Sequence, residues 1–104
     1  MAWTDYQADA PPDTSYNGWS NRETWVINLW LDNNEHDSKY LYDLANDGRA
    51  LYDQAKELEE FITEAWQDIV ELQKIEASMW ADLMNTAIWA VDWREIIEAH
   101  HDDE

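Results

Sequence analysis

The sequence contains no cysteine and is poor in glycine, proline and basic residues. Without cysteine the chain has neither a disulfide framework nor thiol chemistry. With glycine only at Gly18 and Gly48, it has no glycine-rich loop that could hold a phosphate. No basic segment precedes an apolar run near the start, and no apolar run approaches the roughly 20 residues that span a bilayer. We therefore expect a cytoplasmic protein without a signal peptide or membrane span.

The charge balance is the most unusual property of the chain. Six Lys and Arg stand against 24 Asp and Glu, which gives a formal net charge of −18. Such a surface repels nucleic acid and anionic membranes and attracts basic protein surfaces. Eight Trp and five Tyr indicate a packed core rather than disorder. The alternative, that the acidity only serves solubility, stays open at this stage.

Residues 19–33 form the stretch around which we expect the fold to be organised. Ser20 and Glu23 have the spacing of a capping box, which predicts a helix that starts at Ser20. The following residues are apolar almost all round, which is typical of a buried helix. The sequence thus predicts a central helix with Trp25, Leu29 and Trp30 in the core. A ligand-binding role for this Trp pair is the alternative.

Apolar periodicity predicts further helices and no strand. We expect a loop over 32–37, a short helix over 38–46, a long helix over 49–73 and a helix over 79–90. Ser78 can cap the last of these. A final short helix begins near 92–95. The predicted fold is all-α, a small bundle of four to five helices with a buried Trp-rich central helix and one long helix.

The chain length of 104 residues predicts one domain with two short flanking segments. Residues 1–17 read as a flexible arm, 18–99 as the helical domain and 100–104 as an acidic tail. Asn17 and Gly18 predict a turn before the central helix. We expect no metal and no cofactor. The acidic run 32–37 lacks the calcium-loop pattern, and adjacent His100 and His101 do not share a helix face.

The long helix carries an apolar seam on one side. Its members recur at spacings of four and three residues, which is a heptad pattern. They are Leu51, Ala55, Leu58, Ile62, Ala65, Ile69 and Leu72. The seam can pack inside one chain, or it can form the interface of a homodimer. The helix over 79–90 has its own apolar face, made by Trp80, Leu83, Met84, Ala87, Ile88 and Val91. Trp93, Ile96 and Ile97 should anchor the last helix.

The other side of the long helix carries a stripe of carboxylates at helical spacing. Its members are Asp53, Glu57, Glu60, Glu64, Asp68 and Glu71. Like charges at these spacings cost a helix a few tenths of a kcal/mol per pair. A solvated helix face usually mixes both signs of charge. We therefore predict this acidic stripe as the partner-binding site.

Two segments of the chain resemble a known group of sequences. They are YNGWSNRETWVINLWLDN at 16–33 and ADLMNTAIWAVDWREI at 81–96. They are similar to a family of small phage and plasmid proteins with a Y-N-G-W-[ST]-N-x-E-T-W motif and a terminal V-[DN]-W-x-E-I motif. The resemblance covers residues 16–97. It implies a mobile-element protein in a bacterial cytoplasm and implies no enzymatic activity.

These observations favour a binding protein over an enzyme. No catalytic motif is visible, and histidine occurs only at His36, His100 and His101. One hypothesis is a DNA mimic of anti-CRISPR type, which inhibits a CRISPR effector, another defence nuclease or a further basic, nucleic-acid-binding host protein. A helix with one carboxylate per turn, about 5.4 Å apart, offers a ladder of charge comparable to duplex DNA. The alternative is a structural or regulatory interaction protein that uses its aromatic surface or dimerises. Neither hypothesis involves direct contact with nucleic acid or membrane.

Overall fold

The computed structural model describes residues 14–74 and 78–102. Over these residues the chain forms five α-helices and no strand, which confirms the predicted all-α bundle. The helices are α2 (Arg22–Asn33), α3 (Glu35–Ala45), α4 (Leu51–Gln73), α5 (Met79–Ala90) and α6 (Trp93–Ala99). None of these helices is long and apolar enough to cross a bilayer.

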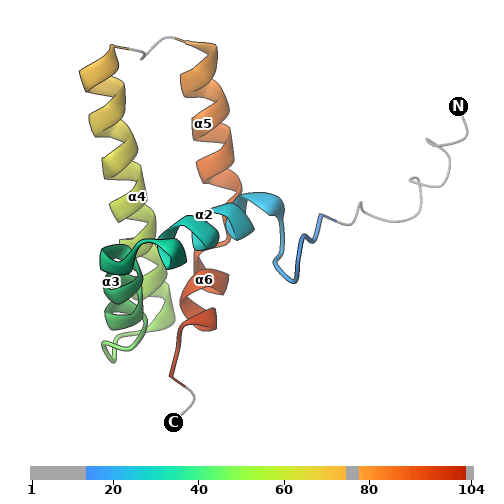
Figure 1. Cartoon of the computed structure of the whole chain (residues 1–104), viewed down its shortest axis with the longest axis vertical. Coiled ribbons are helices and arrows are strands. Elements are labelled where there is room, and N and C mark those ends of the chain that lie inside the picture. Colours follow the sequence, from blue (N-terminus) through green and yellow to red (C-terminus); the bar gives the residue numbers. More distant parts are fainter. Residues whose placement is uncertain (1–13, 75–77, 103–104) are drawn as a thin grey trace, which may run out of the picture.

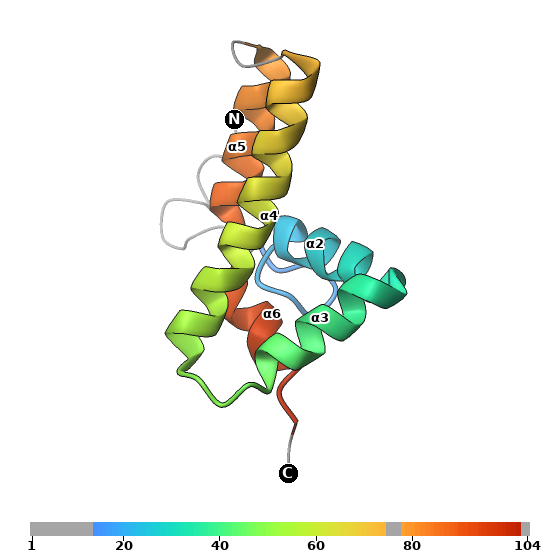
Figure 2. The same cartoon turned by 90° about the vertical axis from the view of Figure 1, so that its left-hand side faces the viewer.

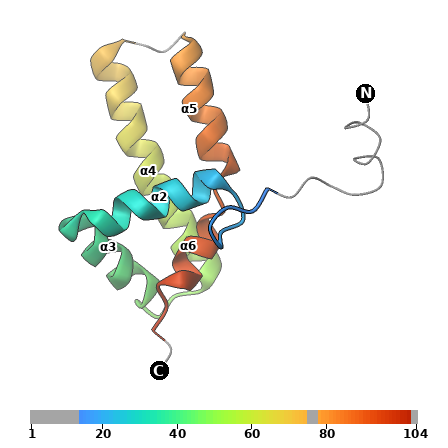
Figure 3. The same cartoon turned by 45° about the vertical axis from the view of Figure 1, so that its right-hand side comes forward.

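The helices divide into a body and a projecting hairpin (Figure 1). The body consists of α3, the first half of α4 and α6, with α2 lying across it, and α4 packs against both α3 and α6. The hairpin consists of the second half of α4 and of α5, which run antiparallel beyond the body. Figure 2 shows α2 and α3 on one side of the long α4, and Figure 3 shows α2 crossing the base of the hairpin. The single long helix therefore belongs to both parts.

The core lies where α3, α4 and α6 meet. Its completely buried apolar side chains are Leu41, Leu58, Ile96 and Ile97. All three predicted anchors of the last helix are buried, although α6 has only seven residues. Such a short helix is not stable alone, so its packing against α4 holds it in place.

The prediction of a buried central helix is wrong. Trp30 is 70% exposed, Leu29 is also exposed and Trp25 is only half-buried. The buried side chains of α2 are Thr24, Asn28 and Leu31 instead. The reason is that α2 lies across the outside of the bundle, so only one side of it is covered. Ile27 is partly buried and packs against the core, whereas Leu29 and Trp30 are exposed.

The predicted start of this helix is also wrong, by one residue. The N-cap is Asn21, whose Oδ1 accepts a hydrogen bond from the Thr24 backbone N–H at 2.8 Å. The Ser20 backbone N–H donates to the Glu95 carboxylate instead, at 3.0 and 3.2 Å. Ser and Asn cap helices about equally well. Tertiary contact with α6 therefore decides which of the two takes the capping position.

Removing the observed cap should destabilise the protein. Asn21→Ala is expected to lower the free energy of unfolding by about 1–2 kcal/mol. The Thr24 N–H and hydroxyl lose their acceptor, and the Ala90 carbonyl loses its donor. Ser20→Ala is the control and should stay within about 0.5 kcal/mol, because Ser20 contributes its backbone to the contact with Glu95. Urea denaturation of the two variants measures the difference. If Ser20→Ala lowers the free energy of unfolding more than Asn21→Ala, Ser20 is the N-cap after all.

The other helix limits follow the sequence closely, with one exception. The predicted loop over 32–37 is wrong, because only Asn34 separates α2 from α3, and its Oδ1 caps α3 at the Asp37 N–H, 3.0 Å away. Ser78 caps α5 at the Ala81 N–H, 3.1 Å away, as predicted. The turn at Asn17 and Gly18 is confirmed, with φ of 49° and 89°.

The flanking segments contact the domain where the structure describes them. Of the predicted arm, residues 1–13 lie outside the described residues. Tyr16 exchanges two backbone hydrogen bonds with Trp19, at 2.8 and 2.9 Å. In the predicted tail, His100 Nε2 lies 2.9 Å from Asp32 Oδ1. Both ends of the described chain are therefore held against the helices.

Candidate functional site

The acidic stripe lies on the side of α4 that faces away from the core. Successive helix positions turn by about 100°, which places the stripe opposite the buried Ala55 and Leu58. All of its members except Glu57 are exposed. From Asp53 to Glu71 the stripe runs along about 27 Å of straight helix, at 1.5 Å per residue. The structure thus places the predicted residues together on one solvent-facing surface.

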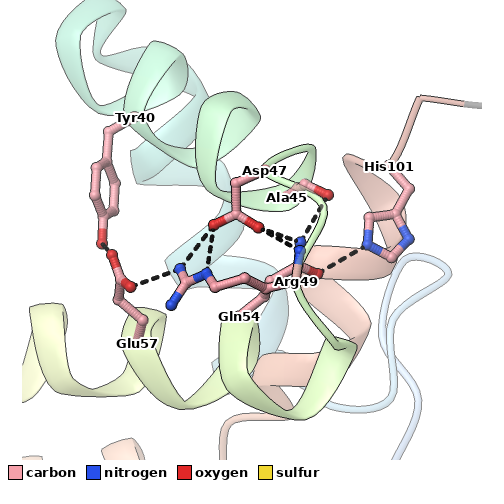
Figure 4. A network of polar contacts seen from close by, with 7 residues as sticks. All are labelled: Tyr40, Ala45, Asp47, Arg49, Gln54, Glu57 and His101. Atoms are coloured by element: carbon pink, nitrogen blue, oxygen red, sulfur yellow. Dashed lines mark hydrogen bonds and ion pairs between the residues drawn. The ribbon is translucent and has the colours of Figure 1, made fainter.

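Glu57 differs from the rest of the stripe because it belongs to a network at the base of the body (Figure 4). Its Oε1 forms an ion pair with Arg49 Nη2 at 2.6 Å, and its Oε2 accepts a hydrogen bond from the Tyr40 hydroxyl at 3.5 Å. Burial, and next the charge of Glu57, raise the pKa of Tyr40 to about 12. Glu57 therefore links α4 to α3 and to the connection between them.

The same network continues through a buried amide. Gln54 donates from Nε2 to Asp47 Oδ1 at 2.9 Å and to the Ala45 carbonyl at 3.3 Å. Its Oε1 lies 3.2 Å from His101 Nε2 (Figure 4). Hydrogen bonds from Arg49, and next from Gln54, hold the pKa of Asp47 well below its usual range. The network fixes the first turns of α4 and so orients the stripe.

The other cations of the chain leave most of the stripe uncompensated. All six Lys and Arg lie in the described ranges. Lys56 reaches Glu60 at 3.9 Å, an exposed i,i+4 pair of the kind that contributes little. Lys39 pairs with Asp43 at 2.8 Å, on α3. Within 14–74 and 78–102, no cation forms an ion pair with the remaining carboxylates, which are Asp53, Glu64, Asp68 and Glu71.

This distribution shifts the candidate site along the helix toward the hairpin. Three of the uncompensated carboxylates, Glu64, Asp68 and Glu71, lie in the hairpin half of α4. Sequence spacing was enough to place them on one side of the helix. The structural role of Glu57 was missed because Arg49 and Tyr40 precede α4, and helical spacing carries no information about residues in other elements.

A second feature is an open cleft where the starts of α2 and α6 meet the first half of α4. It has a volume of about 510 Å³, within the range of small-molecule sites. Lys56 and Arg94 line it together with Glu59 and Asp92, so its charges largely balance. Among the described residues, no group of three or more acidic or histidine side chains could hold a metal ion.

Hydrogen bonds beside this cleft join the two segments that carry the family resemblance. The Thr24 hydroxyl accepts from the Asp92 backbone N–H at 2.8 Å. The Asn21 side chain donates from Nδ2 to the Ala90 carbonyl at 2.7 Å. Together with the bond from Ser20 to Glu95, these contacts tie the start of α2 to the start of α6. The residues of both segments that form these bonds have structural roles here.

Comparison with known proteins gives a match to a protein family. No curated protein and no solved structure matches the chain. The model of DUF7249, a family of unknown function, matches residues 12–103. The match spans all five helices and extends to the segment that contacts Asp32 and Gln54. The chain therefore belongs to the DUF7249 family, a family of unknown function.

Proposed function

We propose that this protein is a non-enzymatic inhibitor that binds the basic, nucleic-acid-binding surface of another protein. The observation that carries the proposal is the uncompensated row Glu64, Asp68 and Glu71, with Asp53 nearer the body. The row lies on the exposed side of a rigid helix in a chain of net charge −18. A charge of this size exceeds what solubility requires of a small domain.

The geometry of the row suits a groove that normally holds a nucleic-acid backbone. Carboxylates at i, i+4 and i+7 recur about once per helical turn, at about 5.4 Å along the axis. Proteins meet duplex DNA with Lys and Arg arranged along its phosphates. The like charges of the row repel one another in the free protein. A cationic partner relieves that repulsion and adds attraction of its own, which speeds association.

The class of protein that this inhibitor binds can be specified further. The resemblance to phage and plasmid proteins suggests action in the cytoplasm of a bacterial host. Mobile elements meet restriction and CRISPR nucleases there, and these enzymes hold nucleic acid in basic channels. An acidic helix that occupies such a channel excludes the nucleic acid. We therefore propose a defence nuclease, such as a CRISPR effector, as the partner.

Charge reversal on the hairpin half of α4 tests the proposal. The variant Glu64→Lys, Asp68→Lys, Glu71→Lys should lose binding to the basic partner, while its far-UV circular dichroism and melting temperature stay those of the parent or improve slightly. Glu57 is left unchanged because Arg49 and Tyr40 contact it. Affinity purification from a bacterial lysate, followed by salt titration of the complex, provides the measurement.

A second triple variant controls for total charge. Glu35→Lys, Asp82→Lys, Glu98→Lys changes the net charge equally at exposed positions on α3, α5 and α6. It should retain binding, and the parent complex should weaken steeply between low and moderate salt. Binding that survives the α4 reversal, or that is lost equally in both variants, contradicts the proposed site.

Exposed apolar side chains support a second candidate function. Several large apolar side chains of α5 and of the end of α4 are exposed, among them Trp80 and Leu72. An exposed apolar patch on a soluble protein commonly marks an interaction site. This favours an interaction protein that acts through its apolar surface. Salt distinguishes the two functions, because an apolar interface does not weaken as salt increases.

A further inference from the structure

The apolar seam of α4 extends beyond the part of the domain that covers it. In the body the seam is covered, with Ala55 and Leu58 buried and Ile62 half-buried. In the hairpin the later seam residues Ala65, Ile69 and Leu72 are exposed, Leu72 to 78%. Because the spacing of the seam does not change, the difference arises from the neighbours. The helices that cover the seam pack only on its first half.

The apolar side of α5 shows the same change along its length. Near the body Ile88 is buried and Met84 is half-buried. Toward the free end of the hairpin, Trp80 is 65% exposed and Leu83 is exposed as well. Among the helices that the structure describes, only α2 crosses the hairpin, and it does so at the base (Figures 1 and 3). We name the exposed residues Ile69, Leu72, Trp80 and Leu83 the distal apolar face.

The distal apolar face is separate from the contact between the two hairpin helices. That contact includes a hydrogen bond of 2.9 Å from Trp66 Nε1 to Asn85 Oδ1. Trp66, Val70 and Ala81 are buried in the same part of the hairpin. Each hairpin helix thus has one apolar side for its partner helix and another that is left uncovered.

We infer that a second copy of this chain covers the distal apolar face. Two hairpins laid face to face form a four-helix bundle, the usual solution for paired helices with an apolar side. A two-fold axis brings the same patch of both copies together. The exposed side chains of the face offer an apolar area on the order of several hundred Å² per copy, the size of a patch that marks an interaction site. This area is below the roughly 800 Å² per partner of a standard interface, so we expect a dimer of modest affinity.

The position of the charges favours a second copy over a basic partner at this face. Its four residues are uncharged, and the acidic stripe lies on a different side of α4. Two distal apolar faces can therefore meet without placing the stripes in contact. A basic segment would instead have to bury its cations against apolar side chains, which is costly. The dimer leaves both stripes exposed, so the inference stands whether or not the proposed function is correct.

The dimer should have an unusual dependence on salt. Two chains of net charge −18 repel each other over distances longer than the interface. At about 1 M salt the screening length falls to about 3 Å, which removes most of this repulsion. Dimer formation should therefore increase with salt, whereas the complex with a basic partner should weaken.

Sedimentation velocity of the full chain at low salt and at about 1 M salt tests the inference. We expect a dimer whose fraction rises with salt and with protein concentration. Trp80→Glu should raise the dimer dissociation constant about tenfold or more, because it places a charge in the centre of the interface. The matched control is Trp89→Glu on the same helix. Trp89 is 85% exposed and lies nine residues from Trp80, on the opposite side of α5.

Both Trp variants should keep the melting temperature of the parent, because both side chains are largely exposed. A full chain that stays monomeric at every salt concentration overturns the inference. A dimer that weakens with salt overturns it too. The inference is also overturned if Trp89→Glu disrupts the dimer as much as Trp80→Glu does.

Discussion

Leu58→Ala is expected to lower the free energy of unfolding by about 2–5 kcal/mol. Leu58 is completely buried in α4, the helix against which both α3 and α6 pack. Truncation removes apolar contacts and leaves a cavity that the surrounding helices can fill only in part. For a domain of this size, a loss of that magnitude is a large share of the total stability. Urea denaturation followed by circular dichroism measures it.

Trp30→Ala is the matched control for this prediction. It removes a larger side chain, but Trp30 is 70% exposed, so the loss should stay within about 0.5 kcal/mol. The prediction of α2 as a buried central helix requires the opposite ranking. If Trp30→Ala destabilises the protein more than Leu58→Ala, the outer position of α2 is wrong.

Thr24→Val should destabilise the protein by about 1–3 kcal/mol, although it conserves side-chain volume. The Thr24 hydroxyl is buried, donates to Asn21 Oδ1 at 2.7 Å and accepts from the Asp92 N–H at 2.8 Å. Valine leaves the Asp92 N–H without its acceptor. Leaving a buried donor unpaired costs more than the net gain from a typical hydrogen bond.

Thr24→Ser separates the role of the hydroxyl from that of the methyl group. Serine keeps both hydrogen bonds and loses one methyl, at a cost of about 0.8 kcal/mol. Valine should therefore be the more damaging variant in urea denaturation. If the two variants are equally stable, or if valine is the better one, the bond between α2 and α6 contributes nothing to the fold.

The sequence predicted the helices better than their arrangement. Apolar spacing and caps placed α4 and α5 almost to the residue, because both signals are local. The same spacing could not show that α2 lies outside the bundle. An apolar residue such as Trp30 does not reveal whether another segment of the chain covers it, and in the structure Trp30 is 70% exposed.

The candidate site shows the same limit. The stripe could be located from spacing alone, since its members share one helix. The ion pair between Glu57 and Arg49 could not be predicted in this way, because Arg49 lies in the connection before α4, where helical spacing does not apply. The contacts of His100 and His101 with Asp32 and Gln54 were also missed. Adjacent histidines in a charged segment give no sign of such distant partners.

The packing of α6 against α4 has a consequence for how the domain folds during synthesis. The ribosome makes α2, α3 and α4 first, but α3 covers only part of the side of α4 that holds Leu58, and the rest is covered when α6 has emerged. The hairpin lies between them in the sequence, so closing the body joins segments far apart along the chain, at an entropic cost. The nascent chain therefore exposes apolar surface through most of its synthesis. Completion of α6 is the event that converts it into a protected domain.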